Sequence, residues 1–183
     1  METSNLNRID FKTILANRLK PEMFEPVQPQ DRLLKGFTFN EIRLKLAKQI
    51  GLIWLDIFEL YGWRRSTPKV HPRQINMFHT SKPIALEVHN NWKTSNFDAK
   101  QSKFKTLKDF KLDHPNFTVI YGCINDFKNR DYLNRDYIRV LTNDRFLEYM
   151  LGNDWMKVER YLKDYITDFL SKNDIHHWFA FSR

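Results

Sequence analysis

Residues 73–94 read RQINMFHTSKPIALEVHNNWKT, and they contain two short apolar segments separated by a turn. The segments cover about 74–79 and 84–89, and Ser, Lys and Pro lie between them at 81–83. Runs of this length, rich in apolar residues and bounded by turn-forming residues, predict the two strands of a hairpin. The second strand carries an acidic residue, Glu87, and Asn76 lies eleven positions earlier, at the start of the first strand.

Helical and strand-like patterns flank this hairpin. We expect helices over about 10–19, 40–61, 98–112 and 154–170, a short helix from 143, and strands over 117–124 and 137–141. Asn40 and Asn143 are predicted N-caps, and Gly62 is a predicted C-terminal glycine of the helix at 40–61. From residue 40 onward the predicted order is α-β-β-α-β-β-α-α, an α/β fold with a mixed sheet flanked by helices.

The length of 183 residues favours a single domain. We place its core at about 40–151, between an N-terminal helical arm at 1–39 and a C-terminal helix and tail at 152–183. The sole cysteine, Cys123, lies in an apolar run, so we expect a buried thiol and no internal disulfide. The N-terminus lacks a signal-peptide pattern, and no apolar run reaches the roughly 18 residues of a membrane span. These features predict a cytoplasmic protein without a membrane partner.

The composition is strongly basic, with a formal net charge of +8 and a pI of about 9.5. Lysine and arginine side chains that neutralise phosphates release the counterions condensed on nucleic acid, so this charge favours polyanionic partners. Charge alone leaves open a basic domain that never binds nucleic acid.

The hairpin carries groups suited to phosphodiester hydrolysis, which needs a hard cation, an activated water and stabilisation of developing charge. Mg²⁺ prefers oxygen ligands and keeps several waters. Oxygen ligands at the start of a hairpin and on the returning strand can share such an ion. A residue two positions after the second ligand points to the same face of the strand, because side chains alternate with period two.

These segments resemble the core of the PD-(D/E)XK nuclease superfamily, and more narrowly type II restriction endonucleases. The resemblance covers about 73–151 and rests on 73–77, 84–90, 114–125, 138–141 and 146–149. It implies a restriction-endonuclease-like fold and Mg²⁺-dependent cleavage of double-stranded DNA, with no small-molecule cofactor. It also implies a homodimer, because a two-fold protein cuts both strands of a palindrome symmetrically.

The resemblance assigns Asn76 and Glu87 to the metal-ligand positions, and it assigns catalytic positions to Asn76, Glu87 and His89, with Lys93 as a further candidate. Asn76 stands where the family carries its first Asp, and His89 stands at the lysine of E-x-K. Three interpretations are open: natural activity with His89 or Lys93 replacing the lysine, a catalytically dead binding form, or an inactivated form in which Asn76 replaces an original Asp.

The candidate DNA contacts are basic or amide-bearing residues near the hairpin: Arg64, Arg65, Lys69, Asn90, Asn91, Thr94, Asn96 and Lys100. Amides can read adenine, and lysine or arginine can read guanine or bind phosphate. Simpler interpretations stand beside these. Glu87 can be a salt-bridged acid, His89 a structural histidine, 90–96 a solvated loop, and the lysines along 100–111 a solvated helix face.

Two further carboxylates, Asp56 and Glu59, could complete a metal site, although ion pairs are the more ordinary role for such residues. An HNH-like site at 113–116 and a metal site at His176 and His177 are weaker alternatives. The rival functions are a non-catalytic DNA-binding protein on the same fold and an unrelated basic nucleic-acid-binding protein.

Overall fold

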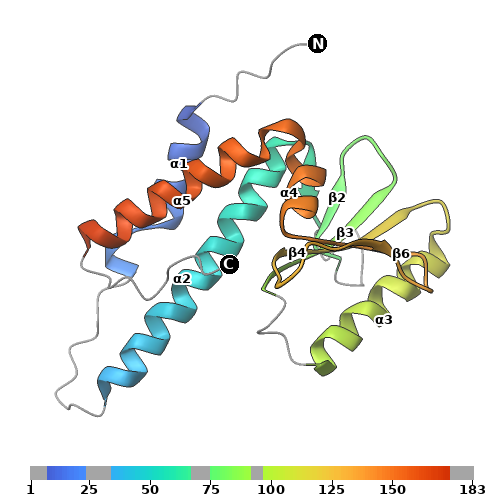
Figure 1. Ribbon diagram of the computed structural model, residues 1–183, viewed down its shortest axis with the longest axis horizontal. Helices are drawn as coiled ribbons and strands as arrows, with labels where there is room; N and C mark the ends of the chain where they lie inside the picture. The colour runs from blue at the N-terminus through green and yellow to red at the C-terminus, as the bar shows by residue number, and fades with distance from the viewer. Residues whose placement is uncertain (1–7, 24–33, 67–74, 92–96, 174–183) are drawn as a thin grey trace. The chain divides into compact units, whose positions relative to one another are not determined.

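The computed structural model describes residues 8–23, 34–66, 75–91 and 97–173 (Figure 1). The chain separates into two compact units, one of residues 1–57 with 162–182 and the other of residues 58–161 with Arg183. The prediction of one domain with a core at 40–151 stays a prediction. No helix within the described ranges is long and apolar enough to cross a membrane.

The first unit is helical. It contains α1 (Arg8–Arg18), the short 3-10 helix η1 (Pro21–Met23), and parts of α2 (Leu34–Leu60) and α5 (Trp155–Lys172). Arg18 binds Asp56 through two hydrogen bonds, Nε to Oδ2 at 2.6 Å and Nη2 to Oδ1 at 3.0 Å. Asp56 therefore has the ion-pair role that its sequence allowed.

Helix α2 begins six residues before Asn40, so the prediction that Asn40 caps this helix is wrong. Extending an existing helix by one residue costs less free energy than nucleating a new helix. The low helix propensities of Gly36 and Asn40 are too small a penalty to stop α2 from extending through them. Gly62 follows the helix with a φ of +85°, the left-handed conformation typical of a glycine just after a helix end.

The second unit is built on a six-stranded mixed sheet in the order β1-β2-β3-β4-β6-β5. Strands β1, β2 and β3 pair antiparallel, β3-β4 and β4-β6 pair parallel, and β5 pairs antiparallel with β6. The strands are β1 (Trp63–Arg65), β2 (Met77–His79), β3 (Ile84–Asn91), β4 (Thr118–Asn125), β5 (Asp131–Leu133) and β6 (Ile138–Thr142). The α/β class with a mixed sheet is confirmed, while β1 and β5 lie in segments where we predicted no strand.

Two helices cover opposite faces of this sheet (Figure 1). Helix α3 (Phe97–Asp113) connects the parallel strands β3 and β4, and α4 (Asn143–Leu151) follows β6, leading through η2 (Gly152–Asp154) into α5. On the α3 face, Leu107 and Phe110 join Phe78 and Val119 in a buried apolar cluster. Cys123 is fully buried, as predicted.

Asn143 does not cap α4, because Thr142 holds the N-cap position. Asn143 instead adopts a φ of +50°. Its side-chain Oδ1 accepts the backbone N–H of Asp126 at 2.6 Å, and its Nδ2 donates to the backbone carbonyl of Asp126 at 3.0 Å. Asparagine is among the residues that best tolerate this left-handed conformation. Asn143 therefore fixes the segment that follows β4.

On the α4 face, Gly122 of β4 lies directly under the buried ring of Phe146, which packs edge-on against Phe58 at 5.7 Å. A Cβ at Gly122 would overlap the Phe146 ring. Gly122→Ala is therefore expected to lower the free energy of unfolding by about 1–3 kcal/mol, the usual cost of an overpacked core.

Urea denaturation measures this effect, and Gly51→Ala is the matched control. Gly51 lies inside α2 with no atom within 4 Å of an added Cβ, so alanine there should raise stability by about 0.5–1 kcal/mol. Equal denaturation midpoints for Gly122→Ala and the parent chain would contradict the packing described here.

Candidate active site

Glu87 lies in the middle of β3, and its side chain is only 2% exposed. Its Oε2 accepts a hydrogen bond from the backbone N–H of Asn76 at 3.2 Å. In return, Oδ1 of Asn76 accepts the backbone N–H of Val88 at 2.8 Å. The structure therefore brings Asn76 and Glu87 together, with Asn76 immediately before β2 and joined to β3 by two hydrogen bonds.

The second oxygen of Glu87 binds a lysine that sequence reasoning missed as a site residue. Nζ of Lys103, on α3, lies 2.5 Å from Oε1 of Glu87, and the lysine side chain is 29% exposed. From sequence, Lys100 is a candidate DNA contact, and a solvated helix face is the simpler interpretation of the lysines along 100–111. The sequence spacing indicates that Lys103 faces the sheet. Lys103 precedes the buried Leu107 by four residues and Phe110 by seven, which places all three on one side of α3.

His89 follows Glu87 by two positions on the same face of β3. Its Nε2 lies 3.9 Å from Oε1 of Glu87. The imidazole stacks on the ring of Tyr121 with centroids 4.9 Å apart, and Tyr121 stacks in turn on Phe104 at 4.5 Å. His89 thus borders the carboxylate while its ring is held in an aromatic layer between β3, β4 and α3.

Burial is the main influence on the Glu87 carboxyl, and it raises the pKa above its ordinary value. The ammonium of Lys103 and the N–H of Asn76 act in the opposite direction, because both stabilise the ionised form. Burial also raises the pKa of Tyr121, and the nearby Cys123 and Glu87 add to that shift, so the phenol stays neutral at pH 7. The site is a buried acid balanced by one basic side chain.

The oxygen donors match a partial magnesium site. Mg²⁺ commonly takes one or two carboxylates, keeps several waters and completes its shell with substrate phosphate oxygens. Glu87 supplies one carboxylate, and Asn76 supplies a neutral amide oxygen beside it. Among the residues that the structure describes, no group of three or more His, Cys, Asp or Glu could hold a metal ion. Glu59 pairs with Arg65 at 3.6 Å, which is the ordinary role that its sequence allowed.

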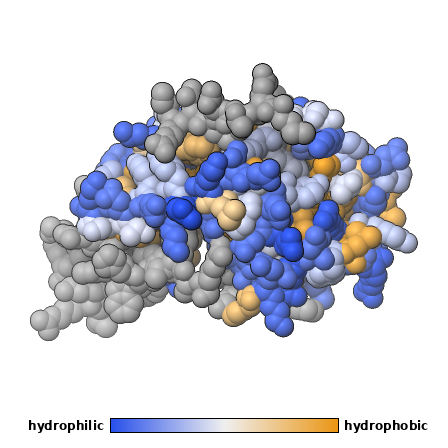
Figure 2. All heavy atoms as spheres, turned by 45° about the horizontal axis from the view of Figure 1, so that its top comes forward, coloured by the Kyte–Doolittle hydropathy of each residue, from blue (hydrophilic) through white to orange (hydrophobic). Residues whose placement is uncertain are grey.

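The remaining candidates fall into two sets. Arg64 is exposed on β1 beside the paired Arg65, Asn90 and Asn91 occupy the end of β3, and Lys100 lies in the first turns of α3. Lys69, Lys93, Thr94 and Asn96 lie outside the described residues. Figure 2 shows one face of the molecule, where hydrophobic residues form small separate patches among hydrophilic ones.

Comparison with known proteins adds no identification. No protein-family model matches the chain, and the search of curated proteins found no match.

Proposed function

We propose that this chain is a Mg²⁺-dependent DNA endonuclease of the type II restriction class, with its active site at Glu87. The observation that carries the proposal is a buried carboxylate in mid-strand, held between the start of the preceding strand and a lysine from the crossover helix. A buried acid with a shifted pKa and a specific charged partner is a common mark of a functional site. The basic composition favours DNA as the partner.

The order of the elements supports the same proposal. An antiparallel hairpin carries Asn76 before β2 and Glu87 on β3, and α3 then crosses to the parallel strand β4. These are the elements to which the resemblance assigned the two metal-ligand positions. In the proposed enzyme two copies of the chain act as a homodimer, so that one site cuts each strand of a palindrome.

In this mechanism Glu87 and Asn76 would hold the metal, and the polar side chains around them would contact the phosphate. Bound Mg²⁺ would supply Lewis-acid polarisation of the phosphate and a water of lowered pKa. His89 occupies the lysine position of the E-x-K motif on β3. Lys103 takes the role of that lysine, because its Nζ reaches Glu87 from α3. Its ammonium neutralises charge that develops on the phosphate oxygens.

Lys103→Ala is expected to lower the cleavage rate by about 10²-fold, the usual loss when one charge-stabilising donor is removed. It should also shift the acid limb of the pH–rate profile upward. The ion pair favours ionised Glu87, so losing it raises the pKa of that carboxyl, and the active ionised form then appears only at higher pH.

The measurement is the initial rate of plasmid cleavage from pH 5 to 9, repeated in an Asn76→Asp background. Lys105→Ala is the matched control, because Lys105 is exposed on the same helix. If the two alanine variants have the same rate and the same pH profile, Lys103 has no role in the reaction.

A non-catalytic DNA-binding protein is the second candidate, and one observation favours it. The side-chain oxygen of Asn76 already accepts the N–H of Val88, and both oxygens of Glu87 already have partners. A closed set of hydrogen bonds of this kind can be purely structural.

Incubation of supercoiled plasmid with the protein and Mg²⁺ or Mn²⁺ separates the two candidates. Discrete fragments that disappear with EDTA support the endonuclease. Sequence-specific retention of DNA without cutting, by both the parent chain and the Asn76→Asp variant, supports the binding protein. Binding without sequence preference that weakens steeply with salt would contradict both, and it would favour an unrelated basic nucleic-acid-binding protein.

A further inference from the structure

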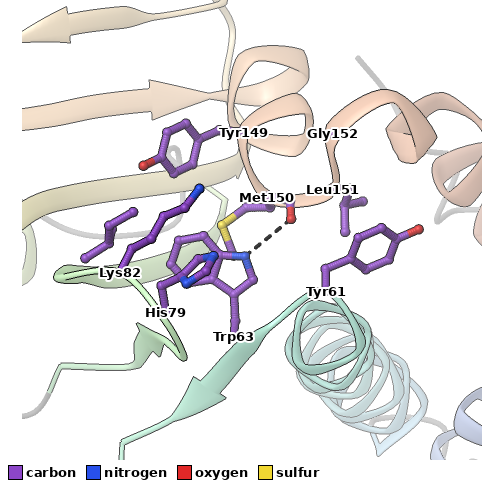
Figure 3. Close-up of a pocket in the computed structure, with 9 residues that line it drawn as sticks. Tyr61, Trp63, His79, Lys82, Tyr149, Met150, Leu151 and Gly152 are labelled. Atoms are coloured by element: carbon purple, nitrogen blue, oxygen red, sulfur yellow. Dashed lines mark hydrogen bonds between the residues drawn. The ribbon is translucent and has the colours of Figure 1, made fainter. Parts of the chain in front are cut away.

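A cavity of about 310 Å³ lies on the α4 side of the sheet, within the second unit (Figure 3). Helices α3 and α4 cover opposite faces of the sheet (Figure 1). Glu87 binds Lys103 of α3, so the cavity lies on the other face from Glu87. Its walls come from the turn after α2, strands β1 to β3 and their turn, α4 and the start of η2: Tyr61, Trp63, His79, Lys82, Ile84, Tyr149, Met150, Leu151 and Gly152.

Aromatic rings dominate these walls. The ring of His79 packs edge-on against the ring of Trp63, with the ring centroids 5.0 Å apart. The ring of Tyr149 is tilted relative to that of Trp63, with the centroids 6.2 Å apart. The indole is 3% exposed, and its Nε1 donates a hydrogen bond to the carbonyl of Met150 at 3.3 Å (Figure 3). Three rings from two strands and a helix therefore meet in one place, with Trp63 as their fixed centre.

Tyr149 is also positioned by contacts with Arg139 on β6. The guanidinium of Arg139 lies 5.4 Å from the centre of the Tyr149 ring. Arg139 is itself anchored to Asp131 by two hydrogen bonds, Nε to Oδ1 at 2.9 Å and Nη2 to Oδ2 at 2.8 Å. A wall positioned in this way loses little conformational freedom when a planar ligand stacks against it.

One lining side chain, Lys82, is positively charged. Burial, with a contribution from Lys82, lowers the pKa of His79 below its ordinary value, so the imidazole is neutral at pH 7. Lys82 is exposed in the turn between β2 and β3, and it has no ion pair with another described residue. None of the lining residues is acidic, and Asp154 lies next to the cavity in a hydrogen bond with Tyr61. The cavity thus combines aromatic walls with a single ammonium at its edge.

We propose that this cavity binds one nucleotide, with the base against the rings of His79 and Tyr149, which the buried Trp63 supports, and the phosphate near Lys82. Every base offers a π face to an aromatic wall, and lysine is a common partner of phosphate. The volume is at the small end for ligand sites, which suits a single base with its sugar. The nucleotide is either free or an unpaired unit of a nucleic-acid strand. The proposal does not depend on cleavage, because the cavity shares no residue with the Glu87 site.

The test is a calorimetric titration of the full chain with dAMP, dCMP and 2-deoxyribose 5-phosphate, which lacks the base. Both nucleotides should bind saturably, and the sugar phosphate should bind at least tenfold more weakly. Tyr149→Ala should weaken dAMP binding about tenfold, and Lys82→Ala about fivefold. Tyr132→Ala and Lys105→Ala, which alter exposed residues outside the cavity, should bind within twofold of the parent.

Lys82→Ala keeps the test valid if Tyr149→Ala does not fold, because Lys82 lies in an exposed turn. Equal binding of dAMP and sugar phosphate, no saturable binding of either nucleotide, or equal losses in the control variants would overturn the proposal. Competition by a short single-stranded oligonucleotide indicates a strand unit, and its absence indicates a free nucleotide. Glu87→Gln distinguishes the two proposals, since it should lose cleavage and retain dAMP binding.

Discussion

Asn76→Asp is expected to raise the rate of Mg²⁺-dependent DNA cleavage by about 10²-fold or more. The backbone N–H of residue 76 already lies 3.2 Å from the Glu87 carboxylate, so an aspartate there would place two carboxylates at one position. A carboxylate is a better Mg²⁺ ligand than an amide, and several kcal/mol of charge stabilisation correspond to at least this factor in rate. The aspartate can still accept the N–H of Val88, so the hairpin should keep its geometry.

Two measurements are needed, the rate of plasmid linearisation and the Kd for Mn²⁺ by calorimetry, which does not depend on turnover. Asn116→Asp, at an exposed position before β4, controls for the added charge. The increase in cleavage rate should become larger at higher pH, because two adjacent carboxylates raise each other's pKa and both ionise fully only at higher pH. Equal cleavage and equal Mn²⁺ affinity in parent and variant would show that residue 76 is not a metal ligand.

The hairpin, α3 and β4 were predictable because each has a strong local pattern. The boundaries of α3 and β4 differ from the predicted ranges by one residue at each end. Strands β1 and β5 were missed for a physical reason. Each has three residues, too few to show alternation, and all three residues of β5 are exposed, so backbone pairing to a neighbour rather than composition defines it.

The candidate site was predictable in part. The proximity of Asn76 and Glu87 follows from hairpin pairing, which local sequence specifies. The contact of Lys103 with Glu87 depends on how α3 packs on the sheet, and five lysines share that helix, so composition alone could not distinguish this one. The stacking of His89 on Tyr121 joins residues on neighbouring strands, and only the parallel register of β3 and β4 brings them together.

Glu87→Gln, made in the Asn76→Asp background, is expected to reduce cleavage by about 10³-fold or more. Glutamine has nearly the same shape as glutamate, and its carbonyl oxygen can still accept the N–H of Asp at 76. The lost property is the negative charge, on which both metal affinity and the ion pair with Lys103 depend. Removing one partner of a buried ion pair also destabilises a fold, so thermal unfolding must be measured with the rate.

Glu148→Gln is the control for this change, because Glu148 is an exposed acid on α4 whose ion pair with Arg145 is at the surface. Its rate should match that of the parent background, since exposed ion pairs contribute little. DNA binding in EDTA, measured by gel shift, should be nearly unchanged in Glu87→Gln, because this carboxylate is buried and contributes no phosphate contact of its own. A folded Glu87→Gln protein that cuts at the parent rate would place the active site elsewhere in the chain. A folded Glu87→Gln protein that binds the same DNA without cutting it would show that Glu87 acts in the chemical step.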